Sequence, residues 1–226
     1  MAELIVAFDL DSLGEAERLL EKMPNLRWAK IGPTLFLRSG LDCIRLFKER
    51  GVEVFLDLKW HDIPHQVAGA AKAASEAGVS LATVHAVGGR KMVESAVQAA
   101  GEMRIAAVSV LTSHSEESYA ESVGREGGVV VEDEVRRLVT LATEAGAQAV
   151  VASPLEAKMV SEVVPNGTWI VVPGIRPKGS EVGDQTRVAT PTDAVGAGAT
   201  HLVVGRPITG SSRPQGVFDE IWEDLK

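Results

Sequence analysis

The sequence has very little cysteine, which limits the chemistry it can support. Cys43 is the one cysteine in 226 residues, so an internal disulfide and a thiolate metal cluster are both excluded. The surrounding LDCIRLF segment predicts a buried position in a helix rather than a catalytic thiol. We therefore expect no redox role for this residue.

Long apolar runs and basic clusters are also scarce. The apolar runs are far shorter than the roughly 20 residues of a membrane-spanning helix. The N-terminal segment MAELIVAFDLDS has no basic stretch before its apolar run, so we expect no signal peptide, no anchor and a cytoplasmic location. The net charge is -8 with a pI near 5.2, and no basic stripe is present. We expect neither nucleic acid nor a membrane as a partner.

Short runs rich in Val, Ile and Ala, each of strand length, recur along the whole chain. Eight such runs are candidate strands: residues 3–10, 27–32, 52–59, 80–87, 104–112, 147–153, 168–174 and 200–206. Segments with helical spacing of apolar residues lie between them, at 12–23, 34–50, 67–77, 91–100, 132–145 and 155–164. This alternation of strand and helix predicts a parallel sheet.

Glycines stand between several predicted helices and the strands that follow, as expected for left-handed helix caps, at Gly51, Gly78, Gly101, Gly146 and Gly198. Eight strands buried on both faces can form a closed barrel or an open doubly wound sheet. No glycine-rich dinucleotide loop follows the first strand, which favours the barrel. We predict an α/β fold in which residues 1–226 form a single (β/α)8 TIM-barrel domain.

Two stretches break the alternation, Ser113 to Val130 and Arg176 to Thr190, and both are rich in Gly, Ser and charged residues. They follow the fifth and seventh predicted strands, on the side where barrels bind ligands. We predict that they are lids over that face.

A charged cluster ends the third predicted strand, in VEVFLDLKWHDIPHQ. Asp57 and Lys59 are two residues apart and project to one face, and Asp62 follows in the loop. One interpretation is a structural ion pair at a strand end. The other is catalytic: a Lys between carboxylates stays protonated and can protonate a developing carbanion, while the carboxylates favour loss of a substrate carboxylate as carbon dioxide.

Further motifs surround this DLKWHDIP segment. FDLD, AKIG, LTS, PGIRP with GDQTR, and VVGRPIT follow one another along the chain from about residue 4 to the C-terminus. In order and spacing the sequence resembles the orotidine 5'-monophosphate decarboxylase family. The resemblance implies decarboxylation of orotidine 5'-monophosphate to uridine 5'-monophosphate, the last step of de novo pyrimidine synthesis, with no metal or organic cofactor.

The resemblance also implies roles for the charged residues. Lys59 would protonate C6 of the pyrimidine, and Asp57 would lie beside the departing carboxylate. Asp62 would complete the charged array in the neighbouring subunit, which implies a homodimer. Asp9 and Lys30 would contact the ribose hydroxyls, although Asp9 alone would equally suit a helix cap.

Other substrate contacts are implied in the same way. Thr112 and Ser113 match residues that meet the pyrimidine ring, although such a pair is also ordinary turn chemistry. An Arg beside a Gly at the end of the eighth strand is where barrels commonly hold a phosphate. The remaining matched substrate-binding positions are Ile63, Gln66, Pro173, Arg176, Gln185, Gly205 and Arg206.

The histidines are assigned no chemistry. His65 and Gln66 stand where the family usually has a small polar pair ending in Thr, so we expect altered local geometry there. His61 is interpreted as structural. The others, His85, His114 and His201, are not spaced as a metal site, so no metal is expected.

Two alternatives remain. The related 3-keto-gulonate 6-phosphate decarboxylase and hexulose phosphate synthase group shares an Asp-x-Lys-x-x-Asp pattern but uses magnesium. Its members carry a glutamate for the metal where this chain has Lys30, which would repel the ion. The other alternative is a non-catalytic nucleotide-binding barrel that keeps the phosphate-binding residues.

Overall fold

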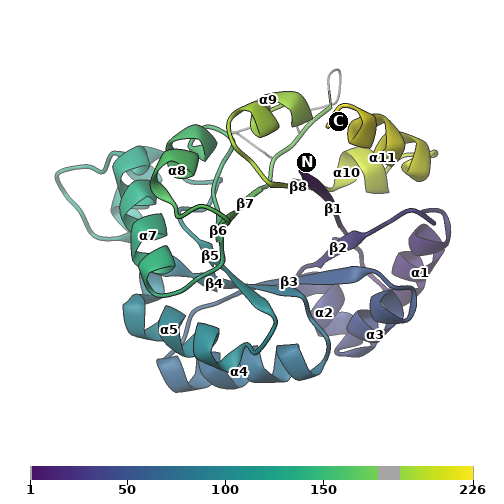
Figure 1. The fold of residues 1–226 in the computed structure, drawn as a ribbon, viewed down its shortest axis with the longest axis horizontal. Helices are drawn as coiled ribbons and strands as arrows, with labels where there is room; N and C mark the ends of the chain where they lie inside the picture. Colours follow the sequence, from purple (N-terminus) through teal and green to yellow (C-terminus); the bar gives the residue numbers. More distant parts are fainter. Residues whose placement is uncertain (1, 178–188, 226) are drawn as a thin grey trace.

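The computed structural model describes residues 2–177 and 189–225. Eight parallel strands close into a barrel in sequence order, and Figure 1 looks into the ring they form. The strands are β1 (Glu3–Ala7), β2 (Trp28–Ile31), β3 (Glu53–Trp60), β4 (Leu81–His85), β5 (Arg104–Val108), β6 (Ala149–Val151), β7 (Trp169–Val172) and β8 (His201–Val204). The predicted parallel (β/α)8 barrel is confirmed.

Helices surround this ring on the outside (Figure 1). They are α1 (Leu13–Glu21), α2 (Pro33–Ser39), α3 (Asp42–Glu49), α4 (Pro64–Glu76), the 3-10 turn η1 (Ala86–Gly88), α5 (Arg90–Ala99), α6 (Glu116–Ser122), α7 (Val131–Glu144), α8 (Ala157–Val163), α9 (Pro191–Gly196), α10 (Arg206–Thr209) and α11 (Pro214–Glu223). None of the helices within the described ranges is long and apolar enough to span a membrane.

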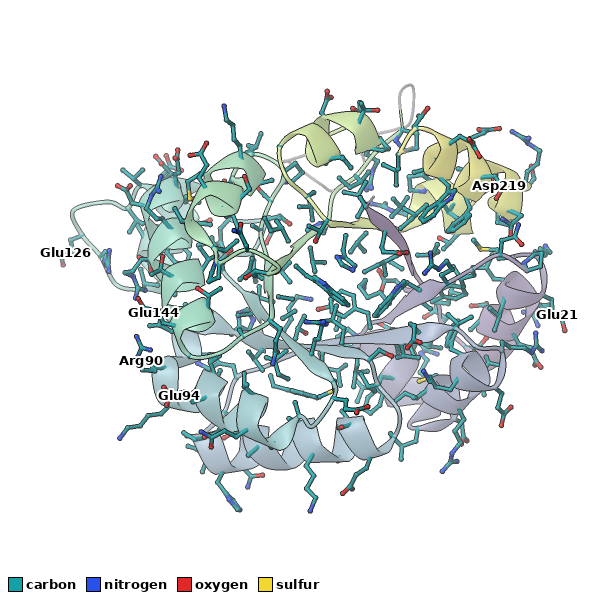
Figure 2. All side chains as sticks on the ribbon, in the orientation of Figure 1. Glu21, Arg90, Glu94, Glu126, Glu144 and Asp219 are labelled. Atoms are coloured by element: carbon teal, nitrogen blue, oxygen red, sulfur yellow. The ribbon has the colours of Figure 1, made fainter. Side chains whose placement is uncertain are left out.

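The barrel interior covers one face of the sheet and the surrounding helices cover the other. Apolar side chains therefore lie on both faces. One cluster lies between strands and helices and includes Phe8, Leu35 and Phe47. A second cluster fills the barrel interior: Ile5, Ala7, Trp28, Phe55, Leu81, Ala106, Ala149, Val171 and Val203. Side chains fill the centre of the ring in Figure 2, whereas the labelled Glu21, Arg90, Glu94, Glu126, Glu144 and Asp219 lie at its periphery. The barrel is a packed core with chemistry available only at its ends.

Left-handed glycines end several helices as predicted. Gly51, Gly78, Gly101, Gly146 and Gly198 all have positive φ, between 59° and 98°. The prediction of one helix over 34–50 is wrong, because Gly40 (φ 55°) breaks it into α2 and α3. Cys43 is buried on α3, where its Sγ lies 2.9 Å from the carbonyl oxygen of Gly40, and burial raises its pKa to about 11.

The segment from Ser113 to Val130 is not loop throughout. It contains α6, whose N-terminus is capped by Ser115. Tyr119 of α6 donates a hydrogen bond to Glu134 of α7 (3.0 Å), and Arg137 makes a two-point ion pair with the same carboxylate. Part of the predicted lid is therefore held against the barrel wall. The second predicted lid falls largely on residues 178–188, outside the described residues.

Candidate active site

A cavity of about 430 Å³ opens at the carboxyl ends of the strands. Residues from seven of the eight strands, or from the loops after them, contribute to its wall. Its apolar lining includes Ala7, Phe55, Val108, Val110, Leu111, Val151, Ala152, Val171 and Val203. Its polar lining is Asp9, Lys30, Asp57, Lys59, Thr112, Arg176 and Arg206, with Pro173, Gly174 and Gly205 at the ends of β7 and β8. Charges in such an apolar cavity interact more strongly than they would in water.

Four charged groups of the cavity form a continuous chain. The Lys30 ammonium lies 2.8 Å from Asp9 Oδ1 and 3.5 Å from Asp57 Oδ2. On the other side of Asp57, its Oδ1 accepts a hydrogen bond from Lys59 Nζ at 2.9 Å. The signs alternate along the chain, so each carboxylate has an ammonium beside it. The predicted contact between Asp57 and Lys59 is therefore present.

Asp57 is as enclosed as Lys30, and each of the two residues is 9% exposed. Burial opposes the ionisation of Asp57, but the charges of Lys30 and Lys59, together with hydrogen bonds from Lys59 and Thr83, outweigh burial and hold its pKa below the usual range. A buried carboxylate that stays ionised is a strong local source of negative potential. Asp57 therefore repels any second carboxylate brought next to it.

The ion pair between Asp9 and Lys30, at the start of this series of four charges, depends on the small size of a glycine. A Cβ placed on Gly32 would lie 2.6 Å from Asp9 Oδ1 and 3.4 Å from Lys30 Nζ. Any side chain at residue 32 would therefore displace the Asp9–Lys30 ion pair. The glycine of the AKIG motif is required for close approach rather than for a left-handed turn.

Two guanidinium groups also line the cavity, at the ends of β7 and β8, the strands that complete the barrel next to β1. Arg176 donates to the carbonyl oxygen of Ile175 at 2.9 Å. Its pKa is lowered by burial and then by the positive charge of Arg206. Two neighbouring cations in a partly buried wall favour an anion between them, and Arg groups bind phosphate through paired N–H donors.

Comparisons with known proteins agree with this geometry. Residues 2–221 match the model of the Orotidine 5'-phosphate decarboxylase / HUMPS family. The chain belongs to this family. Orotidine 5'-phosphate decarboxylase of Halorhodospira halophila is 46% identical over 216 residues, covering 93% of this chain and 90% of that protein. The enzyme of the same name from Thermobifida fusca is 47% identical over 215 residues, covering 94% and 91%.

A solved structure of the family has the same fold along its whole length. The crystal structure of orotidine 5'-phosphate decarboxylase from Lactobacillus acidophilus matches with a TM-score of 0.89 at 34% identity, covering 100% of both chains. An uncharacterized conserved protein from Geobacillus kaustophilus matches with a TM-score of 0.87 at 30% identity, covering 99% of this chain and 100% of that one. The predicted membership of the orotidine 5'-phosphate decarboxylase family is confirmed.

The cavity of this family member collects most, but not all, of the residues expected from sequence. It brings together Asp9, Lys30, Asp57, Lys59, Thr112, Pro173, Arg176, Gly205 and Arg206. Asp62, Ile63 and Gln66 lie outside its lining and are exposed, and Ser113 also lies outside it. Gln185 falls outside the described residues.

Asp62 has a local partner in place of Lys59. Its Oδ1 accepts a hydrogen bond from the backbone N–H of Ile63 at 2.6 Å. Ile63, the residue before α4, is 62% exposed. This turn therefore presents an acidic and an apolar side chain to solvent at the rim of the site.

Two of the histidines are neighbours. His61 and His85 have ring centroids 5.9 Å apart, and burial, followed by the charges of His61 and Lys59, lowers the pKa of His85. His114 lies 3.1 Å from Ser118 Oγ, and His201 is on β8. Over residues 2–177 and 189–225, no three His, Cys, Asp or Glu side chains come together as a metal site.

Sequence analysis missed two residues that lie outside the cavity lining and support its charged chain. Gly32 was visible in AKIG, but its role requires knowing that Asp9 packs against it. Thr83 on β4 contacts both Asp57 and Lys59. The sequence did not mark Thr83 as a functional residue, because a Thr inside an apolar strand is ordinary β-sheet composition.

Proposed function

We propose that this protein, acting as a single domain, decarboxylates orotidine 5'-monophosphate to uridine 5'-monophosphate in pyrimidine biosynthesis. The observation that carries the proposal is the alternating chain Asp9–Lys30–Asp57–Lys59 in a cavity that Arg176 and Arg206 also line. The guanidinium groups of such a site suit a phosphate, and the end of the charged chain formed by Asp57 and Lys59 can both repel a carboxylate and supply a proton. The names of the relatives support the same reaction.

The substrate binds across the mouth of the barrel. Arg176 and Arg206 hold the phosphate with the backbone of Gly205, and Asp9 and Lys30 contact the ribose hydroxyls. The remaining contacts to the base are assigned to Thr112, Ser113, Pro173 and Gln185. Binding energy from the phosphate orients the base although the phosphate itself does not react.

Asp57 and Lys59 carry the chemical step. The ionised Asp57 lies beside the substrate carboxylate and repels it, which favours breaking the bond between C6 and the carboxyl carbon. The electron pair of that bond stays on C6, carbon dioxide leaves, and Lys59 donates its proton to C6. The neutral amine then takes a proton from water. The step balances without an oxidant or reductant.

Lys30 supports a reaction that needs no metal. Its ammonium lies between Asp9 and Asp57, the two carboxylates that a cation in this cavity would have to use. A divalent ion would have to displace this buried ammonium, with which it would share like charge. We therefore assign no metal and no organic cofactor to the reaction.

A metal-free assay tests the proposal. Protein treated with EDTA should convert orotidine 5'-monophosphate to uridine 5'-monophosphate at the same rate as untreated protein. Failure to form product, together with magnesium-dependent activity on a sugar phosphate, would assign the chain to the magnesium-dependent group. Binding of uridine 5'-monophosphate with no turnover of either substrate would indicate a non-catalytic barrel.

We also infer a cytoplasmic homodimer with no nucleic-acid or membrane partner, in which Asp62 completes the site of the partner subunit. Asp62 and Ile63 are exposed beside the cavity rather than within it, which supports a role across a subunit boundary. Gln66, one turn into α4 from Ile63, is assigned to the same shared contact. In a twofold dimer, each subunit would lend this turn to the other.

Mixing two inactive variants tests the sharing. Lys59→Ala and Asp62→Ala are each expected to be inactive, but half of the dimers after random exchange are mixed, and one of their two sites is intact. Activity should therefore return to about a quarter of the parent value. Subunit exchange is verified by native mass spectrometry of differently tagged chains. Verified exchange without any recovery would show that Asp62 does not serve the partner's site.

A further inference from the structure

The backbone at the end of β3 is irregular where it carries the charged cluster. Leu56 pairs with Ala82 and Trp60 pairs with Val84, so three residues of β3, from Asp57 to Lys59, lie opposite one residue of β4. That single residue is Thr83. Lys59 has φ 51° and is the one non-glycine residue with positive φ in the described part of the chain. Such a conformation persists only where surrounding contacts hold it.

The Thr83 hydroxyl makes two contacts across this bulge. Its oxygen accepts a hydrogen bond from the Lys59 backbone N–H at 2.8 Å, and its proton is donated to Asp57 Oδ1 at 3.1 Å. Thr83 is 1% exposed, so water does not compete for either contact. Asp57 Oδ1 also accepts from Lys59 Nζ, so hydroxyl, carboxylate and ammonium form one connected network.

We propose that Thr83 is a positioning residue: its hydroxyl holds Lys59 in its left-handed conformation and orients the Asp57 carboxylate, so that both groups face the reacting bond. This inference rests on the proposed decarboxylation. Thr83 is absent from the cavity lining, so it acts through its two neighbours rather than on the substrate. Without the hydroxyl, the Lys59 N–H would lose its acceptor and the Asp57 carboxylate one of its donors, inside a buried bulge.

The decisive variant is Thr83→Val, which keeps the β-branched shape and removes the hydroxyl. Thr83→Ser, which keeps the hydroxyl, is the conservative partner. Thr200→Val is the matched control, because Thr200 Oγ1 also accepts a backbone N–H from a neighbouring strand, that of Ile170, at 2.8 Å, but at the opposite end of the barrel. All three are compared with the parent by Tm, kcat and KM.

In Thr83→Val, kcat should fall on the order of 100-fold, the cost of a small misplacement of reacting groups, while KM changes by less than about threefold. The acidic limb of the kcat profile should move to higher pH, because a carboxylate that loses a hydrogen-bond donor is easier to protonate. Thr83→Ser should restore most of kcat. Thr200→Val should leave kcat and its pH profile unchanged even where it lowers Tm.

The backbone amide resonance of Lys59 gives a readout that does not depend on turnover. It should shift in Thr83→Val, but not in Thr83→Ser or Thr200→Val. Parent-like kcat and an unmoved acidic limb in folded Thr83→Val would overturn the inference, as would equal losses of kcat in Thr83→Val and Thr200→Val. A third outcome separates the two proposals: the parent protein does not decarboxylate orotidine 5'-monophosphate, but its Lys59 amide resonance shifts only in Thr83→Val. That outcome would contradict the proposed reaction and leave the positioning contact standing.

Discussion

The two ends of this barrel use polar residues in opposite ways. At the carboxyl ends of the strands, four charges alternate around a cavity that a ligand can enter. At the amino ends, Arg104 lies 4.3 Å over the ring of Trp169, which in turn stacks on His201 with centroids 4.1 Å apart. Trp28 meets Trp169 edge to face at 5.9 Å. One end is open and charged, and the other is closed by stacked rings.

The two ends differ in the ionisation state of their buried side chains. Burial at the amino end, together with the charge of Arg104, lowers the pKa of His201 to about 4, so the imidazole there is neutral at pH 7. At the carboxyl end, the neighbouring ammonium groups overcome the burial of Asp57 and keep it charged. Burial alone removes charge, whereas burial with an opposite charge preserves it. The barrel thus keeps buried charges at one end and packs a neutral imidazole among aromatic rings at the other.

The largest difference between the two ends of the barrel should appear in kcat when the proposed proton donor is removed. Lys59→Ala should lower kcat by about 1,000-fold or more, because a positioned general acid contributes about 100- to 10,000-fold. Affinity for uridine 5'-monophosphate, measured by calorimetry, should change much less. Lys48→Ala is the control, because Lys48 pairs with Glu53 at the opposite end of the same strand, at 3.1 Å. Near-normal turnover in Lys59→Ala would refute its role as proton donor.

A smaller effect should come from the phosphate side of the cavity. Arg206→Ala removes a charged hydrogen-bond donor, which contributes roughly 1.5–3 kcal/mol, so KM should rise about 10- to 150-fold. Steady-state kinetics over a wide substrate range measures the change. Arg104→Ala, which removes the guanidinium of the other end, should leave KM unaltered. A similar rise in KM in both variants would mean that net charge, rather than position, binds the substrate.

Much of this arrangement was predictable from local signals. Strand-length apolar runs and left-handed glycines such as Gly146 and Gly198 indicated a parallel sheet, and the lack of a dinucleotide loop after the first strand favoured the barrel over an open sheet. The contact of Asp57 with Lys59 followed from strand periodicity. Their chemical roles came from motif resemblance, because an ion pair by itself is equally consistent with a structural role.

One missed feature is local, whereas the others depend on contacts between distant parts of the chain. Gly40 divides α2 from α3 although the apolar pattern of 34–50 continues through it. The role of Thr83 exists only because β3 bulges against β4, and no periodicity within either strand encodes that bulge. Asp62 accepts a hydrogen bond from the adjacent Ile63 N–H, and the role proposed for it involves a second subunit, which a single sequence does not describe.

The smallest expected effect belongs to the closed end and concerns stability. His201 has a pKa of about 4 when folded and an ordinary value near 6.5 when unfolded, so the unfolded chain binds the proton more tightly between these values. Its contribution to stability is complete above pH 6.5 and is lost as the pH falls toward 4. Between pH 7 and pH 5 the loss is about 2 kcal/mol.

His201→Phe keeps a stacking ring and removes the titrating group. In urea unfolding at pH 7, 6 and 5, its free energy of unfolding should fall by about 2 kcal/mol less than that of the parent. The other four histidines are common to both proteins and cancel in this difference. Equal pH dependence in the two proteins would show that folding does not lower the pKa of His201. The pH profile of kcat should be the same in both, because the groups that react are at the other end of the barrel.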